Sequence, residues 1–255
     1  MLQVNGLNVY ARFLHSTEKI VGEVSFCLED GKRLAIVGES GSGKSMIVNS
    51  LVFSLADNCY ATGEVLLDGV NLFADGKHAR ALAGRQIVFI PQGGAESLNP
   101  ALKIKTQIYE ALARGERKLK RDEKKAYAIY NLAKVGLKNG EEILEKYPFE
   151  ISGGEAQRVV LAIALCGQAK LIVADEATRG IDEETSEIFW DCIDKDFSET
   201  SLIVVTHDMA VARRCDYVLV LKDGEIKEYG TTKDVFANPQ NEYTESLLAM
   251  CGGEK

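Results

Sequence analysis

The stretch that decides the fold reads Gly38-Glu39-Ser40-Gly41-Ser42-Gly43-Lys44-Ser45. It follows the apolar run RLAIV at 33–37 and precedes a helix that the apolar spacing predicts over about 45–55. Small residues between a buried strand and a helix let successive backbone N–H groups, together with the positive end of the helix, face a phosphate group. We therefore predict that this segment, with Met46, binds the phosphates of a nucleotide. Lys44 adds a positive charge, and Ser45 supplies a hydroxyl group for Mg²⁺.

Two further strands end in residues that suit phosphate chemistry. The run LIVAD at 171–175 continues into Glu176, and the strand predicted over 201–206 is followed by His207. In an α/β sheet, ligands bind at the carboxyl ends of the strands. We expect Asp175 to hold Mg²⁺ and Glu176 to orient and polarise the attacking water. His207 is expected to donate a hydrogen bond to the γ-phosphate or to Glu176.

The arrangement of predicted elements indicates an α/β fold with a parallel sheet. Strands alternate with helices in both the first and the last part of the chain, whereas residues 101–168 contain no convincing strand. We predict turns at Glu29-Asp30-Gly31 and at Gly63, and a hairpin at Asp223-Gly224. A helix is predicted over 121–135, with Gly136 ending it.

Composition excludes several classes of protein. The 255 residues carry 30 Lys and Arg against 38 Asp and Glu, a net charge of −8, which argues against nucleic acid as a partner. None of the six cysteines has metal-binding or C-x-x-C spacing, so we expect reduced thiols. The longest apolar run, 159–166, is far shorter than the roughly 20 residues of a membrane-spanning helix. The alternating N-terminal residues do not resemble a signal peptide.

The segment ISGGEAQR at 151–158 connects the chain to a family. Ser152 and Glu155 have the spacing of a capping box, and the glycines Gly153 and Gly154 would expose amide groups at the start of a helix. The segment also resembles the signature motif of ATP-binding cassette (ABC) ATPases. Four more motifs follow the order of that family: Gln92 resembles the Q-loop glutamine, LIVADE the Walker B motif with its catalytic glutamate, Gly180-Ile181-Asp182 the D-loop and His207 the switch histidine.

The resemblance covers essentially the whole chain and implies a P-loop NTPase core. The nucleotide-binding core would span 1–94 and 159–255 and would include an N-terminal antiparallel β subdomain. A helical signature subdomain would be inserted over 95–158. The implied catalytic residues are Lys44, Gln92, Glu176 and His207, and the implied Mg²⁺ ligands are Ser45, Gln92 and Asp175. The resemblance further implies that Ser152, Gly153 and Gly154 of a second ATPase subunit close over the ATP. Tyr10 is favoured over Phe13 as the aromatic residue that stacks on adenine.

A narrower resemblance, to the ATPase subunits of peptide and nickel importers, rests on three segments. These are GESGSGKS, PQGGAESLNP and YPFEISGGEAQR. The resemblance implies a peripheral protein on the cytoplasmic face of the cell membrane that works with integral permease subunits and, indirectly, with a solute-binding protein. Peptide or nickel as the substrate, and a homodimer or a heterodimer, both stay open. The alternatives are a soluble non-transport ABC ATPase, for example in cluster assembly, a small-molecule P-loop kinase, and the degenerate partner of a heterodimer.

Three positions depart from the pattern of the family. Ala177 stands where the family usually has proline, and Arg179 precedes an altered D-loop. Glu155 replaces the more common glutamine of the signature motif. Because a carboxylate near a γ-phosphate would repel it, we expect Glu155 to point away along its helix.

Overall fold

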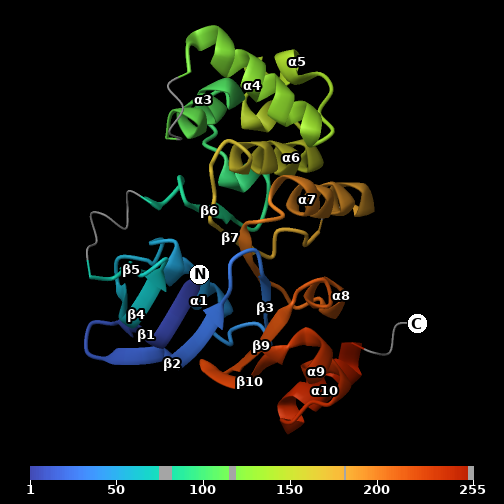
Figure 1. Cartoon of the computed structure of the whole chain (residues 1–255). Helices are drawn as coiled ribbons and strands as arrows, with labels where there is room; N and C mark the ends of the chain where they lie inside the picture. The colour runs from blue at the N-terminus through green and yellow to red at the C-terminus, as the bar shows by residue number, and fades with distance from the viewer. Residues whose placement is uncertain (75–81, 115–118, 181, 252–255) are drawn as a thin grey trace. The chain divides into compact units, whose positions relative to one another are not determined.

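The computed structural model describes residues 1–74, 82–114, 119–180 and 182–251. The chain divides into two compact units (Figure 1). The first unit consists of Met1–Ala83 and Glu199–Lys255, and the second of Gly84–Ser198. Within the described ranges, no helix is long and apolar enough to cross a membrane.

The first unit contains an antiparallel sheet with the strand order β2-β1-β4-β5. Its strands are β1 (Leu2–Arg12), β2 (Thr17–Leu28), β4 (Cys59–Leu67) and β5 (Val70–Asn71). Buried and more exposed residues alternate along much of β1, because successive side chains of a strand point to opposite faces. The N-terminal antiparallel β subdomain expected from the sequence is therefore present.

Gly63 does not form the turn predicted from the sequence. It lies inside β4, where the pairing of β1 with β4 shifts register between Asn5 and Asn8. Its φ angle is 110°, and a Cβ atom there would lie 2.5 Å from the carbonyl oxygen of Gly6. The glycine thus permits a β-bulge and a close backbone approach, so the prediction of a turn was wrong. The turn at Glu29-Asp30-Gly31 is confirmed by a hydrogen bond from the Lys32 N–H to the Glu29 carbonyl.

A second group of strands in the first unit carries the phosphate-loop segment. Its order is β8-β3-β9-β10, with β3 parallel to both β8 and β9 and with β10 antiparallel to β9. The strands are β3 (Arg33–Val37), β8 (Ser201–Val205), β9 (Tyr217–Lys222) and β10 (Glu225–Thr231). Residues 34–37 are almost completely buried, as expected for a strand with neighbours on both sides. The predicted hairpin at Asp223-Gly224 is confirmed, with positive φ angles at both residues.

Helices α1 (Lys44–Leu51), α8 (Met209–Ala212) and α9 (Thr232–Ala237) of the first unit follow strands β3, β8 and β10 in the chain, and α10 (Glu242–Cys251) follows α9. The predicted helix over about 45–55 therefore ends four residues early. The loop between β3 and α1 therefore lies at the carboxyl end of β3.

The second unit is mostly helical. Two parallel strands, β6 (Ile87–Ile90) and β7 (Leu171–Asp175), pair with each other. The helices are α3 (Ile104–Arg114), α4 (Arg121–Lys134), α5 (Gly140–Glu145), α6 (Gly153–Ala164) and α7 (Glu183–Asp196), with short 3₁₀ turns η1 (Ala95–Ser97) and η2 (Pro148–Glu150). Gly136, with a φ of 79°, follows the end of α4 as predicted. The boundaries 95–158 of a helical signature subdomain remain a prediction.

Candidate nucleotide site

The phosphate-loop segment connects β3 to α1 against the neighbouring strand β9. A Cβ atom on Gly38 would lie 2.1 Å from the carbonyl oxygen of Leu221, so only glycine fits at the start of the loop. The hairpin after β9 also contacts the loop, because the Gly224 N–H donates to the Ser42 carbonyl over 2.9 Å. Glu39, Ser40, Gly41 and Ser45 are exposed, so this surface of the loop is open to a ligand.

Lys44 is buried in the loop that precedes it. Its Nζ atom donates to the carbonyl oxygens of Gly38 and Glu39 over 2.8 and 2.7 Å, and it lies 3.4 Å from Ser42 Oγ. The residue is only 6% exposed. These hydrogen bonds hold the positive charge within the loop. There its attraction to the phosphates of a bound nucleotide would be strong.

His207 lies at the same end of the strands as the phosphate loop. Ile36 of β3 pairs with Val205 of β8, and the two strands are parallel. Gly38 and His207 each follow these paired residues by two positions, so both emerge at the carboxyl edge. Asp208 caps α8 by accepting a hydrogen bond from the Ala210 N–H over 2.7 Å. The structure thus brings His207 and the loop to one edge of the first unit.

Tyr10 stacks on Tyr60 in the antiparallel sheet. Their ring centroids are 5.1 Å apart and the rings are inclined by 17°. Tyr10 is half-buried, whereas Phe13 is 53% exposed. One face of Tyr10 therefore already has an aromatic neighbour, and its role in binding adenine stays a prediction.

Gln92, Asp175 and Glu176 share an edge of the second unit. Ile90 of β6 pairs with Ala174 of the parallel strand β7, and Gln92 and Glu176 each follow by two positions. Asp175 is the last residue of β7. Glu176 has a φ of 45°, uncommon for a residue with a side chain, and its side chain is only 13% exposed. Strained backbone of this kind often marks a functional position.

Ser152 begins helix α6 with the predicted capping box. Its Oγ atom accepts from the Glu155 N–H over 3.2 Å, and the Glu155 carboxylate accepts from the Ser152 N–H over 2.8 Å. Glu155 thus turns back towards the start of the helix, and the expectation that it points away was wrong. The capping hydrogen bond holds the carboxylate there. Gly153 is exposed, with open space around it, and Gly154 is partly exposed.

Comparison with known proteins identifies the family. The ABC transporter model matches residues 21–179, more than half of the chain. The chain belongs to the ABC transporter family. It is 35% identical over 257 residues to the oligopeptide transport ATP-binding protein OppD of Bacillus subtilis (strain 168), covering 98% of this chain and 71% of that protein. It is 32% identical to the metal-staphylopine import system ATP-binding protein CntD of Staphylococcus aureus (strain Mu50 / ATCC 700699), covering 91% of this chain and 87% of the relative.

Solved structures agree with this assignment. A dimeric ATP-binding cassette in a post-hydrolysis state, bound to ADP and Pi, has 25% sequence identity and a TM-score of 0.79, covering 91% of this chain and 98% of that one. The P-loop NTPase fold expected from the sequence is confirmed, and the chain is an ABC ATPase that binds ATP. The expected D-loop residue Ile181 lies outside the described residues.

The oxygen donors of the ABC ATPase suit magnesium. Ser45 offers a hydroxyl group, Gln92 an amide oxygen and Asp175 a carboxylate, and hard cations such as Mg²⁺ prefer oxygen ligands. Within the described ranges, no group of three or more His, Cys, Asp and Glu side chains forms a metal-binding cluster. Mg²⁺ is commonly held by one or two carboxylates together with substrate phosphates, so the chemistry of each of these side chains suits it.

Helix α6 contacts the loop that follows β6 and the loop that follows β7. The sequence did not predict these contacts. The buried Gln157 side chain donates to the Ala177 carbonyl over 2.8 Å. A Cβ atom on Gly94 would lie 2.6 Å from the backbone nitrogen of Gln157, so the loop after Gln92 packs directly on the helix. No local sequence pattern predicts these contacts, because they join segments that are distant in the sequence. The signature helix therefore positions the two loops that carry Gln92 and Glu176.

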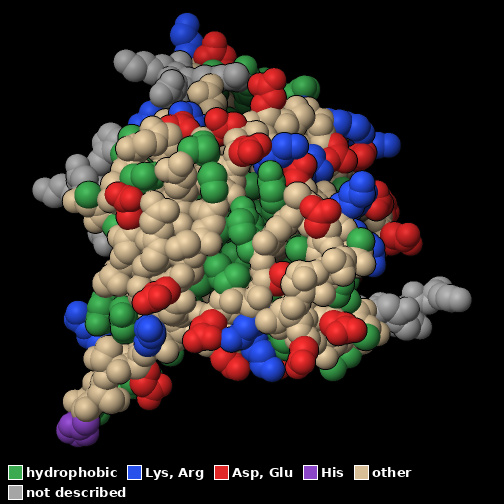
Figure 2. Space-filling model, turned by 60° about the horizontal axis from the view of Figure 1, so that its bottom comes forward, with side chains coloured by type: hydrophobic (Ala, Val, Ile, Leu, Met, Phe, Trp, Pro, Cys, Tyr) green, Lys and Arg blue, Asp and Glu red, His purple; other side chains and the backbone are tan. Residues whose placement is uncertain are grey.

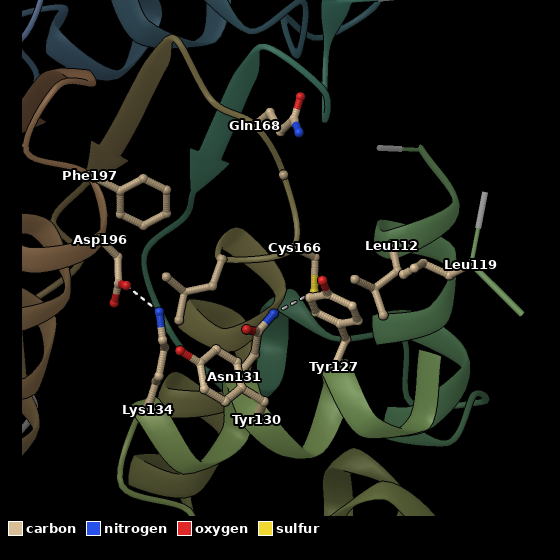
Figure 3. A pocket seen from close by; sticks show the side chains of 12 residues that line it. Leu112, Leu119, Tyr127, Tyr130, Asn131, Lys134, Cys166, Gln168, Asp196 and Phe197 are labelled. Carbon is tan, nitrogen blue, oxygen red and sulfur yellow. Dashed lines mark hydrogen bonds and ion pairs between the residues drawn. The ribbon is translucent and has the colours of Figure 1, made fainter. Parts of the chain in front are cut away.

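A cavity of about 270 Å³ in the second unit is separate from these residues (Figure 3). Aromatic and aliphatic side chains line it, together with the ion pair of Lys134 with Asp196. The Asn131 side chain points towards Cys166 and donates to its Sγ atom over 3.4 Å. Burial raises the pKa of the Cys166 thiol to about 11, so it is protonated at neutral pH.

Charged side chains of both signs are intermixed on the face that Figure 2 shows. Among the described residues, oppositely charged side chains also form ion pairs, such as Lys105 with Glu145 and Lys195 with Asp191. Pairs of this kind on the surface contribute little to stability. Cys27, Cys59, Cys166, Cys192 and Cys215 are free thiols.

Proposed function

We propose that this ABC ATPase is the nucleotide-hydrolysing subunit of an importer for a peptide, a nickel chelate or a similar small solute. The observation that supports its ATP chemistry most strongly is the Lys44 ammonium group, buried among the carbonyl oxygens of the phosphate loop. The names of the relatives, oligopeptide transport and metal-staphylopine import ATP-binding proteins, support the direction of transport and the class of solute.

In this proposal, the first unit binds the nucleotide and the second supplies the hydrolytic groups. Backbone amides of residues 38–46 surround the phosphates, and Tyr10 stacks on adenine. Ser45, Gln92 and Asp175 would hold Mg²⁺, which would supply positive charge next to the phosphates. Glu176 orients and polarises the attacking water, and His207 donates to the γ-phosphate or to Glu176. Phosphoryl transfer depends mainly on such positioning and charge stabilisation.

A second ATPase subunit, identical or different, would complete the site. Its Ser152, Gly153 and Gly154 would present exposed amides and a hydroxyl to the γ-phosphate at the start of α6. ATP would stabilise the closed dimer by binding it more tightly than the open form, and hydrolysis would remove that preference. This dependence on a partner predicts slow hydrolysis by an isolated chain.

The remaining partners follow from the importer assignment. Closure of the ATPase dimer would be transmitted to integral membrane permease subunits. This chain would bind them peripherally at the cytoplasmic face of the membrane. A solute-binding protein would act on the complex indirectly. Nucleic acid is not among the proposed partners, and the net charge of −8 supports this.

Purification of the native complex in detergent tests the proposal. We expect integral membrane subunits to copurify with the chain, and proteoliposomes made from the complex to accumulate a dipeptide or a nickel chelate when ATP is supplied. The matched control is the same complex with Glu176→Gln, which should bind ATP without uptake. An active ATPase that purifies only with water-soluble proteins would instead favour the non-transport alternative.

A further inference from the structure

Tyr243 of helix α10 contacts the phosphate loop directly. Its hydroxyl oxygen accepts a hydrogen bond from the backbone N–H of Glu39 over 3.2 Å, although the two residues are 204 positions apart. The Lys222 ammonium group lies 4.5 Å from the centroid of the Tyr243 ring. Burial raises the pKa of Tyr243 above its ordinary value, so the hydroxyl group is protonated at neutral pH. The C-terminal helix therefore reaches the loop through one polar atom.

The peptide group that Tyr243 contacts also holds Lys44. The carbonyl of the peptide between Gly38 and Glu39 accepts from Lys44 Nζ over 2.8 Å, and the N–H of the same peptide donates to Tyr243. A peptide group is planar, and in the trans form its N–H and C=O point in opposite directions. Fixing the N–H therefore fixes the direction of the carbonyl. One rigid group thus connects the Tyr243 hydroxyl to the Lys44 ammonium.

The start of α10 is itself firmly placed. The Tyr243 N–H donates to the Asn241 side-chain oxygen over 2.9 Å. The carboxylate of Glu228, in β10, accepts from the Gln240 N–H over 2.9 Å and from the Asn241 N–H over 3.3 Å. These bonds join the segment before α10 to the strand pair beside β3. The Tyr243 hydroxyl is consequently a fixed acceptor rather than a freely moving surface group.

We propose that Tyr243 is a positioning residue for nucleotide binding, which orients the Gly38–Glu39 peptide so that Lys44 is held at the phosphates. The inference rests on the proposed function only in that Lys44 binds the phosphates of ATP. A neutral hydrogen bond contributes enough to change an equilibrium constant by roughly 2- to 10-fold. We expect loss of the hydroxyl group to weaken ATP and ADP binding by about this factor.

The test compares Tyr243→Phe with Tyr229→Phe in the full chain. Both changes remove one hydroxyl group from the first unit, but the Tyr229 hydroxyl donates to the Cys27 carbonyl over 2.5 Å instead of contacting the loop. Calorimetry should show weaker ATP and ADP binding for Tyr243→Phe and binding within twofold of the unmodified chain for Tyr229→Phe. Without nucleotide, amide hydrogen exchange at Glu39 should be faster in Tyr243→Phe alone.

Each outcome bears on the proposal. Unchanged ATP affinity in Tyr243→Phe overturns it, and so does weaker affinity with unchanged exchange at Glu39, because the effect would then not pass through that peptide. If Tyr243→Phe does not fold, Asn241→Ala replaces it, since this change leaves the hydroxyl group and removes the acceptor of the Tyr243 N–H. Faster exchange at Glu39 then supports the proposal, and unchanged exchange overturns it. Failure of the unmodified chain to bind ATP would instead contradict the proposed function.

Discussion

The Arg179 guanidinium group binds the carboxylate of Glu176, with 2.6 Å between Nη1 and Oε2. Arg179 directly precedes the segment that we expect to be an altered D-loop, and Glu176 is the expected hydrolytic carboxylate. The Glu176 side chain is mostly buried and that of Arg179 is about half exposed. A charge-assisted hydrogen bond of this kind restricts the orientation of the carboxylate. Arg179 thus contacts the group on which hydrolysis is expected to depend.

Glu176→Gln should abolish hydrolysis and preserve ATP binding. The amide oxygen of glutamine can still accept from Arg179, so the loop keeps its contact, but the amide cannot polarise a water molecule as a carboxylate does. With ATP bound and not hydrolysed, the closed dimer should accumulate. Phosphate release and size-exclusion chromatography with ATP measure the two effects. Glu184→Gln, at an exposed residue of α7, is the matched control, and unimpaired turnover in Glu176→Gln would contradict the assignment.

Lys44→Ala should remove most of the ATP affinity. The change deletes the ammonium group and leaves the carbonyls of Gly38 and Glu39 without that donor. A charge contact of this kind is worth about 4 kcal/mol before desolvation at an effective dielectric constant near 20. Calorimetry with ATP measures the loss. Lys227→Ala, which removes an exposed pair with Glu225, should bind ATP normally, and retained affinity in Lys44→Ala would refute the role of Lys44.

Ser152→Ala should impair hydrolysis by the dimer while sparing ATP binding to the isolated chain. It also removes the side-chain cap of α6, which costs about 1 kcal/mol of stability. Thr231→Ala provides the control, because Thr231 caps α9 in the same way through the Asp234 N–H. Both variants should lose similar stability in urea unfolding, but only Ser152→Ala should lose ATPase activity. Weaker ATP binding by the monomeric Ser152→Ala chain would show that Ser152 is misplaced.

Stability should fall at alkaline pH through the buried thiols. Burial raises the pKa of Cys192 to about 11 and that of Cys215 to about 12, from the ordinary thiol value of 9.0. Between pH 9 and the folded pKa values, the unfolded chain releases these protons and the folded chain retains them. The favourable contribution is complete below pH 9 and is lost as pH rises through the folded values. Urea unfolding from pH 8 to 11 measures the change, and the loss should shrink in Cys192→Ala and Cys215→Ala variants.

Local sequence determined most of the elements and suggested the residues that we propose to bind a nucleotide. The apolar run before Gly38, the Ser152 capping box and the Asp223-Gly224 hairpin each depend on residues a few positions apart, so their neighbours in the sequence suffice to predict them. The positions of Gly38, Glu176 and His207 just after apolar runs likewise agree with the tendency of α/β sheets to present ligand-binding residues at the carboxyl ends of strands. Which of these strands pair with one another was not predicted from the sequence.

Only the tertiary structure decided the contacts that fix these residues in place. The bulge at Gly63 depends on Gly6, the Gln157 side chain finds the Ala177 carbonyl, and Tyr243 reaches Glu39 across 204 positions. Each contact joins segments whose own patterns say nothing about one another. These segments meet only when the whole chain packs. That packing also decides which backbone donors and acceptors still need a hydrogen-bond partner.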